Sequence, residues 1–374
     1  MCHLSLRIAQ FLGYFPHSLD QDNLFSPKSK WRRFLHFLPT FLHCLIIFGN
    51  ILGYFIYTNI LHPQTNLMTV AGRQSESNRL YSTVIMTLKA SCHIFVTSYI
   101  KIAIFFKWED LMRFWADFQQ IINLADQLGL QKSGRNEPKV GKDFIAWMFL
   151  CVLLIADMWE GYLLNPNRGD GAAKSVTCVF VIVVPSTVGY LHAIFPFMIT
   201  HFVSCYLEIL GRLKHTVTAS IDLKAQIYTQ LRNHVATCMH IFGGCIVLDM
   251  THSIVRIILC SYFLVGFSNR NSPVVRGAIN DAVTVLAYSF LIWMLCKTGS
   301  QLENESEEVI EKLDGDNDNL QILDGRNIEL WNVTGRKLKQ IFLKTDYFKV
   351  NLGLIAPIVG TVTTNLIVMI QFKK

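Results

Sequence analysis

The side chains most able to do chemistry in this sequence are ionisable groups inside long apolar stretches. Asp249, His252 and Arg256 are spaced i, i+3 and i+7, so a helix would carry all three on one face. A charged group inside a membrane is costly and commonly serves ligand binding or ion passage. The three residues could instead neutralise one another so that the helix can enter the membrane. The spacing alone leaves both interpretations open.

Further ionisable and aromatic residues lie in other apolar stretches. A small-molecule site needs an aromatic-lined cavity with a few converging polar groups, and these residues could supply one. The candidate ligand-binding residues are Lys89, His93, Asp157, Trp159, Glu160, Tyr190, His192, Arg256, Asp281 and Tyr288. Not all of them can contact a ligand. Asp157 and Glu160 lie near the end of their stretch, where a place at the membrane interface competes with ligand contact.

Enzyme and metal chemistry find no support in the sequence. There is no P-loop, no His-Glu-x-x-His and no Gly-x-Ser-x-Gly. The ten cysteines lie in the N-terminal tail or within or beside apolar stretches, without a Cys-x-x-Cys pair, so neither a disulfide framework nor a zinc site is indicated. We expect no enzymatic activity, no cofactor and no metal.

The composition indicates the environment of these groups. Of 374 residues, 51% are hydrophobic, 12% are aromatic and 16% are charged, whereas soluble domains are about a quarter charged. The net charge of +7 comes from cations between apolar stretches, so nucleic acid is not an expected partner. The first apolar stretch is too long for a cleavable signal peptide. We predict an all-α membrane protein in contact with lipid.

Seven stretches are long enough to cross a bilayer, which takes about 20 apolar residues. The predicted spans cover residues 34–61, 80–106, 143–164, 175–206, 235–267, 277–296 and 346–372. Loops on the side of the N-terminal tail (1–33) carry 22 lysines and arginines, against seven on the other side. The positive-inside rule therefore predicts a cytoplasmic N-terminus and an extracellular C-terminus. The sequons at Asn304 and Asn332 would then lie in the cytoplasm and stay unmodified.

The cytoplasmic segment 297–345 is the longest connection. It contains an acidic run from Glu303 to Glu311, a turn-rich sequence at 314–318, and then apolar residues at helical spacing from Leu320 to Phe342. We predict a cytoplasmic helix leading into the last span. A membrane-surface helix or a loose linker is the alternative.

The end of the chain carries a recognisable pattern. Thr364 and Asn365 are followed by five apolar residues and then by Gln371 and Phe372, and Leu12-Gly-Tyr-Phe-Pro16 precedes the first span. With seven spans and an inside N-terminus, this resembles the insect gustatory receptors, of the ligand-gated cation channel superfamily shared with odorant receptors. G-protein-coupled receptors have the opposite orientation, and their Asp/Glu-Arg-Tyr and Asn-Pro-x-x-Tyr motifs are missing here.

The resemblance implies a tetramer whose last helices line a central pore, with cytoplasmic helices anchoring the subunits together. It implies pore or gate roles for Thr364, Val368, Met369, Gln371 and Phe372. A ring of Phe372 side chains could gate by dewetting, and Gln371 could hydrate the open pore. Without the family pattern, the same two residues read as an interfacial aromatic and a polar helix end.

The resemblance also implies the function. We expect a taste receptor acting as a ligand-gated, nonselective cation channel in the plasma membrane of chemosensory neurons, as a homo- or hetero-tetramer with related subunits. Asn365 replaces the family's tyrosine, and Leu366 stands where sugar-type members carry glutamate. Bitter or other non-sugar tastants are therefore favoured over sugars. A metabotropic seven-helix receptor and a membrane transporter are the alternatives.

Overall fold

The computed structural model describes residues 45, 92, 95–127, 194–216, 220–267, 275–323 and 338–371, with the backbone alone at 275–280 and 315–323. The predicted span 143–164 lies outside these residues, as does all of the span 34–61 except Leu45. The remaining predicted spans are described in whole or in part.

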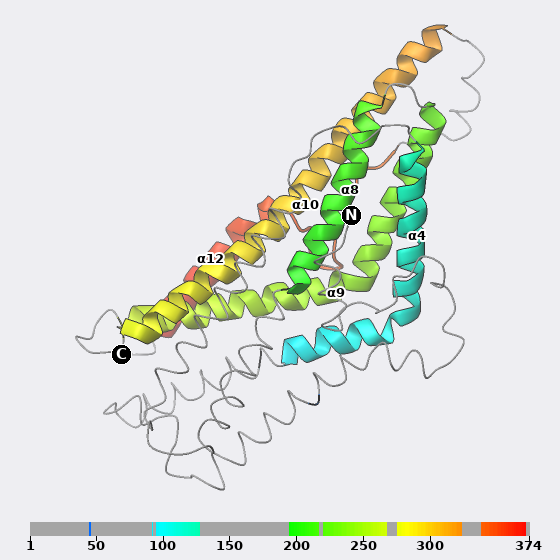
Figure 1. The fold of residues 1–374 in the computed structure, drawn as a ribbon. Coiled ribbons are helices and arrows are strands. Elements are labelled where there is room, and N and C mark those ends of the chain that lie inside the picture. The colour runs from blue at the N-terminus through cyan, green and yellow to red at the C-terminus, as the bar shows by residue number, and fades with distance from the viewer. Residues whose placement is uncertain are drawn as a thin grey trace.

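Long helices dominate the described residues (Figure 1). They are α4 (Trp108–Asp126), α8 (Ile194–His215), α9 (Ile221–Phe267), α10 (Val275–Leu323) and α12 (Ile355–Gln371), with the 3₁₀ turn η4 (Leu352–Leu354) before α12. A further helical segment, Phe95–Phe106, precedes α4. Across the ranges given above there is no strand, and the single isolated bridge pairs Lys344 with Lys349.

Four of the described helices are long and apolar enough to cross a membrane: Ile194–His215, Ile221–Val265, Asp281–Asp314 and Leu352–Gln371. α9 and α10 contain 47 and 49 residues. At about 1.5 Å per residue each extends about 70 Å, more than twice the hydrocarbon thickness of a bilayer. Both helices therefore continue well beyond the apolar segments that the sequence marks as spans.

The segment 297–345 differs from the prediction in two respects. The acidic run from Glu303 to Glu311 and the expected turn at 314–318 both belong to α10. Buried Leu302, Val309 and Leu313 support the helix through the acidic run. Residues 338–351, here named the strap, are not helical, and they turn back at 345–348, where the Thr345 N–H donates to the Phe348 carbonyl. Ile341, Leu343 and Thr345 are buried at every second position, a period of two that the helical interpretation missed.

α4 packs against α8 and the first half of α9 through an aromatic core. Phe114 and Phe118 of α4 lie against Phe202 of α8, with ring centroids 5.3 and 5.9 Å away. His234 of α9 stacks on Phe114, and its Nε2 lies 2.8 Å from the Phe114 carbonyl oxygen. Because a carbonyl can only accept, Nε2–H donates, and Nδ1 of the neutral ring accepts from the Tyr206 hydroxyl at 3.0 Å.

α9 bends near its middle, and Figure 1 shows its two halves running in different directions. The middle carries the pair Gly243 and Gly244, and paired small residues are a common cause of helix kinks. The Nζ of Lys107, between Phe95–Phe106 and α4, donates to the carbonyl oxygens of His240 (2.7 Å) and Ile241 (3.2 Å). These carbonyls would face residues 244 and 245 in a straight helix, so Lys107 stabilises the bend.

Candidate pore helix and intramembrane polar cluster

α12 is apolar yet almost uncovered in the single chain. In its most apolar stretch 6% of the residues are buried, against 44–61% in the other three candidate spans. An apolar helix in lipid needs no protein cover, but it must satisfy its polar groups and its backbone. α12 therefore presents most of its circumference to lipid or to further protein chains.

One face of α12 packs on α9. Ile358 and Val362 lie against the main hydrophobic core, as does Leu354 of η4. Leu366 and Met369 continue this face of α12 and contact Leu259 and Tyr262 of α9. The spacing of three and four keeps the four α12 side chains on one side of the helix.

A second face of α12, not covered by α9, forms another stripe, here named the polar stripe: Thr361, Thr364, Val368 and Gln371. These residues are three, four and three positions apart, so they align along one side. All four are exposed in the single chain, and Val368 is 41% exposed. Three of the four side chains are polar, which is unusual for a face turned to hydrocarbon.

Polar side chains within and beside this stripe bind their own helix. The Thr361 hydroxyl donates to the Pro357 carbonyl at 2.9 Å, and the Asn365 amide donates to the Thr361 carbonyl at 2.8 Å. Such bonds to the preceding turn let polar residues remain in a membrane helix. They also show how Asn365 is accommodated where the family pattern has a tyrosine.

The structure places four of the five expected pore residues. Thr364, Val368 and Gln371 lie on the polar stripe, whereas Met369 faces α9. Phe372 lies outside the described residues. Sequence spacing could have identified Thr361 as a further member, since it precedes Thr364 by three positions on the same face.

A polar cluster lies between α9 and α10 within their apolar segments. The Arg256 guanidinium carbon lies 5.8 Å from the centroid of the Tyr288 ring, and the His252 ring meets the same tyrosine edge-on at 5.6 Å. Asp249 and His252 are both 3% exposed. Asp281, 6% exposed, precedes Tyr288 by seven positions on the same face of α10. Cation–π contacts contribute about 0.5–2 kcal/mol, depending on how far the pair is removed from water.

This cluster contains every candidate ligand residue that the structure describes. Arg256 and Tyr288 are brought together, and Asp281 lies two turns along α10 from them. The remaining candidates, Lys89, His93, Asp157, Trp159, Glu160, Tyr190 and His192, lie outside the described residues.

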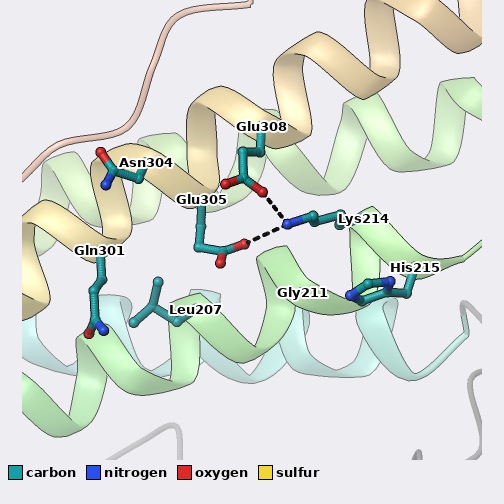
Figure 2. A pocket seen from close by; sticks show the side chains of 8 residues that line it. All are labelled: Leu207, Gly211, Lys214, His215, Gln301, Asn304, Glu305 and Glu308. Atoms are coloured by element: carbon teal, nitrogen blue, oxygen red, sulfur yellow. Dashed lines mark hydrogen bonds and ion pairs between the residues drawn. The ribbon is translucent and has the colours of Figure 1, made fainter.

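A cavity of about 440 Å³ opens between the C-terminal end of α8 and the acidic part of α10 (Figure 2). The Lys214 ammonium spans it, with an ion pair to Glu305 at 3.6 Å and a shorter one to Glu308. Gln301, Asn304 and His215 complete a mostly polar lining. Sites for small organic ligands are mainly apolar, so this cavity does not have the character expected of a tastant pocket.

Comparison with known proteins decides the family. A model of the 7tm Chemosensory receptor family matches residues 3–374. The chain belongs to the 7tm chemosensory receptor family. No curated protein matches the sequence of this receptor.

Solved structures show the fold of the receptor. The insect olfactory receptor OR5 from Machilis hrabei in complex with eugenol superposes with a TM-score of 0.59 at 11% identity, covering 98% of this chain and 97% of that chain. The structure described for OR5 alone gives 0.57 at 12% identity, with the same coverage. At this identity the likeness concerns the fold alone. The predicted seven-helix membrane fold is confirmed, and a chemosensory receptor is not an enzyme.

The sequence did not single out the contacts that hold the strap against α10. Glu303 of α10 binds Lys349, 46 positions further along the receptor chain. Nothing local distinguishes Glu303 from its acidic neighbours Glu305 and Glu307. Gly299 gave a weak signal, as a glycine inside a helix often marks a close backbone approach.

Proposed function

We propose that the receptor is a ligand-gated, nonselective cation channel of the gustatory type, with α12 from each of four copies lining a central pore. The observation that carries the proposal is the exposure of α12. An apolar helix that packs on α9 through one face and carries a polar stripe on the other is suited to a water-filled axis shared between copies. A tetramer is the assembly implied by the superfamily, from identical or related subunits.

The polar stripe supports a pore with a gate near its C-terminal end. Thr361 and Thr364 would offer hydroxyls to hydrated cations along the axis, and Gln371 would lie at the mouth beside Phe372. Narrow apolar constrictions exclude water, and polar side chains restore it when the pore widens. We therefore assign Gln371 and Phe372 to the gate, and Thr364 and Val368 to the wall.

The cluster around Arg256 and Tyr288 supports a ligand-responsive element between α9 and α10. Eugenol, a small aromatic molecule, is bound by the OR5 relative in fold. We assign a small non-sugar tastant as ligand, with Arg256, Asp281 and Tyr288 as described candidates. Ligand binding would favour the conformation for which its affinity is greater, and thereby shift the population toward the open pore.

Orientation and location complete the proposal. The charge bias of the loops supports a cytoplasmic N-terminus, so the C-terminal end of α12 would face the outside. The charged ends of α8, α9 and α10 would then project into the cytoplasm as an anchor between subunits. The plasma membrane of a chemosensory neuron is the corresponding location.

Patch recording tests the proposal directly. Cells expressing the full chain are exposed to caffeine, denatonium, quinine, sucrose, fructose and eugenol while cation current is measured under G-protein blockade. A ligand-evoked current is expected. Phe372→Ala should change its open probability, whereas Gln371→Ala and Thr364→Ala should change the single-channel conductance. Thr363→Ala is the matched control, since Thr363 is exposed on α12 but lies off the polar stripe.

Two outcomes would contradict the proposal. A current abolished by G-protein blockade would indicate a metabotropic receptor. A ligand-dependent conductance equally insensitive to Gln371→Ala, Thr364→Ala and Thr363→Ala would place the ion path elsewhere.

A further inference from the structure

The strap connects to the start of the pore helix and lies against both neighbouring helices at glycines. A Cβ at Gly299 of α10 would collide with the Val350 carbonyl oxygen, and one at Gly243 of α9 would lie 3.9 Å from the Thr345 Cα. Ile341, Leu343 and Val350 of the strap are each 1% exposed. The strap is therefore a packed part of the core that ends at η4.

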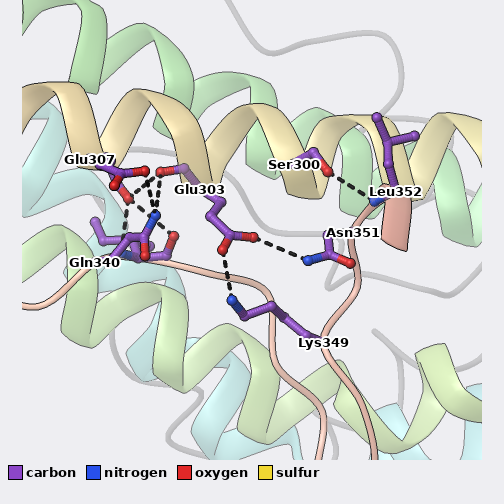
Figure 3. Close-up of polar contacts among 9 residues, drawn as sticks. Ser300, Glu303, Glu307, Gln340, Lys349, Asn351 and Leu352 are labelled. Carbon is purple, nitrogen blue, oxygen red and sulfur yellow. Dashed lines mark hydrogen bonds and ion pairs between the residues drawn. The ribbon is translucent and has the colours of Figure 1, made fainter. Parts of the chain in front are cut away.

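Glu303 holds the end of the strap that leads into η4 (Figure 3). One carboxylate oxygen accepts from the Lys349 ammonium at 2.7 Å, and the other accepts from the Asn351 amide at 3.2 Å. One turn earlier on α10, the Ser300 hydroxyl accepts from the backbone N–H of Leu352 at 2.9 Å. The two α10 side chains thus bind three of the four residues from Lys349 to Leu352.

These contacts replace the usual cap at a helix start. The first backbone N–H groups of a helix lack partners within it, and an asparagine at the cap position normally accepts from one of them. Asn351 occupies that position for η4 but makes no capping bond. Its amide binds Glu303 instead, and Ser300 supplies the acceptor for Leu352. η4 and α12 together are here named the pore-helix unit. Its start therefore depends on α10 for these hydrogen bonds.

The charge pair at this point is partly shielded from water. The Glu303 side chain is 20% exposed and that of Lys349 is 38% exposed. The Lys349 ammonium also lies 4.6 Å from the centroid of the Phe342 ring within the strap. The hydrogen bond from Lys349, followed by that from Asn351, lowers the pKa of Glu303, which lies on α10 beyond the predicted span 277–296. Glu303 is therefore a charged, doubly bonded anchor at neutral pH.

The helices divide their contacts with the pore-helix unit. α12 itself packs along α9, whereas α10 meets this unit through η4. A movement of α10 relative to α9 would therefore reach α12 chiefly at its first turn. The Arg256–Tyr288 contact spans the same pair of helices, so a molecule that changes their spacing would also displace η4.

We propose that Glu303 is a positioning residue for gating: by binding Lys349 and Asn351, it transmits movement of α10 to the start of the pore helix. This inference rests on the proposed channel function. α10 and α12 make few direct contacts, so Glu303 and Ser300 link them through the strap and η4. Coupling between distant sites requires such a physical link with two arrangements.

The test uses full-length receptor with Glu303→Gln, and with Glu303→Lys and Lys349→Glu separately and together. Single-channel currents are recorded with the most effective compound of the panel above, and surface amounts are measured by biotinylation. We expect Glu303→Gln to lower the maximal open probability about fivefold, a typical size for coupling between sites, with unchanged single-channel conductance. Glu303→Lys and Lys349→Glu should each lower the open probability, and the two changes together should restore most of it. Glu311→Gln is the matched control, since Glu311 is an exposed glutamate on the same helix.

Hydrogen–deuterium exchange on the purified receptor provides a readout that needs no ligand. Exchange at residues 349–354 should accelerate in Glu303→Gln and stay unchanged in Glu311→Gln. If Glu303→Gln fails to reach the surface, Asn351→Ala removes one of the two bonds and should lower the open probability about twofold, a smaller coupling of the same sign.

The outcomes separate this inference from the function on which it rests. A wild-type ligand-evoked current that is abolished by G-protein blockade overturns the channel function and the gating role together. A conducting wild type with unchanged open probability in Glu303→Gln overturns the positioning role alone. The positioning role is also overturned if Glu303→Lys with Lys349→Glu does not restore gating. An exchanged ion pair can restore a lost contact between these two residues, but it would not correct a local structural defect.

Discussion

The His234 ring joins α4, α8 and α9 through both of its nitrogens. It is 3% exposed, donates to the Phe114 carbonyl and accepts from Tyr206. Replacing it with phenylalanine keeps the stacking on Phe114 but removes both hydrogen bonds of the ring. Each hydrogen bond lost contributes about 0.5–1.5 kcal/mol. We expect His234→Phe to lower the apparent melting temperature of the detergent-purified receptor, measured by the loss of its monodisperse chromatography peak.

The control for this substitution lies on the same helix. His240 is exposed, so His240→Phe should change the melting temperature little. Equal melting temperatures for His234→Phe and the wild type would show that the ring contributes through shape and stacking alone.

The bend of α9 depends on a lysine from another part of the chain. The Lys107 ammonium satisfies two carbonyls beside the glycine pair, which would otherwise face a displaced turn. We expect Lys107→Met to destabilise the receptor by about 1 kcal/mol, a modest value because the site is partly open to solvent. Lys107→Arg keeps donors and should retain most of the stability. A melting temperature unchanged in Lys107→Met would show that Gly243 and Gly244 suffice to hold the bend.

Substitution by alanine should change the stability of the receptor in opposite directions at two glycines in its long helices. At Gly299 the new methyl group would collide with the strap backbone, and such overpacking costs about 1–3 kcal/mol. At Gly211 of α8 nothing lies within 4 Å, so alanine should stabilise the helix by about 0.5–1 kcal/mol. Thermal unfolding of Gly299→Ala and Gly211→Ala, each against the wild type, measures both. A neutral Gly299→Ala would contradict the close approach of strap and α10.

Element types were easier to predict from the sequence than their limits. Apolar runs predict where a chain can cross a membrane, but the N-terminal half of α9 and the acidic end of α10 are helical through packing in an aromatic and polar core. The strap was predicted to be helical because Leu338, Ile341 and Phe342 fit a helical spacing, whereas the residues that it buries, Ile341, Leu343 and Thr345, have a period of two. Its non-helical form is stabilised by α10, through Ser306 and Glu303, which local spacing does not reveal.

The candidate site was predictable to a similar extent. The terminal motif identified Thr364 and Gln371, and helical geometry places both on the polar stripe. The same motif could not show that Met369 turns toward Leu259 and Tyr262, because that depends on where α9 lies. Arg256 and Tyr288 come from different helices, so their proximity required the tertiary fold.

At the scale of the whole molecule, the polar stripe defines how copies of the chain should meet. If four α12 helices surround one axis, cysteines at Thr364 and Gln371 would face one another across it, while a cysteine at Val362 would face α9. A disulfide forms only when the two Cα atoms come within about 7 Å. We expect oxidation of receptor in membranes to give linked dimers for Thr364→Cys and Gln371→Cys, detected on non-reducing gels.

Val362→Cys is the control, since its side chain packs against the core of its own chain. Of the six native cysteines in the described parts, four are buried and two are half-buried within their own chain, and wild-type receptor oxidised in parallel measures the background from all ten. Linked dimers for Val362→Cys but not for Gln371→Cys would mean that α12 turns its apolar face to the axis. In that arrangement the threonines and Gln371 would face lipid, which is costly for polar side chains in a bilayer, so the cross-linking pattern distinguishes the two rotations of the pore helix.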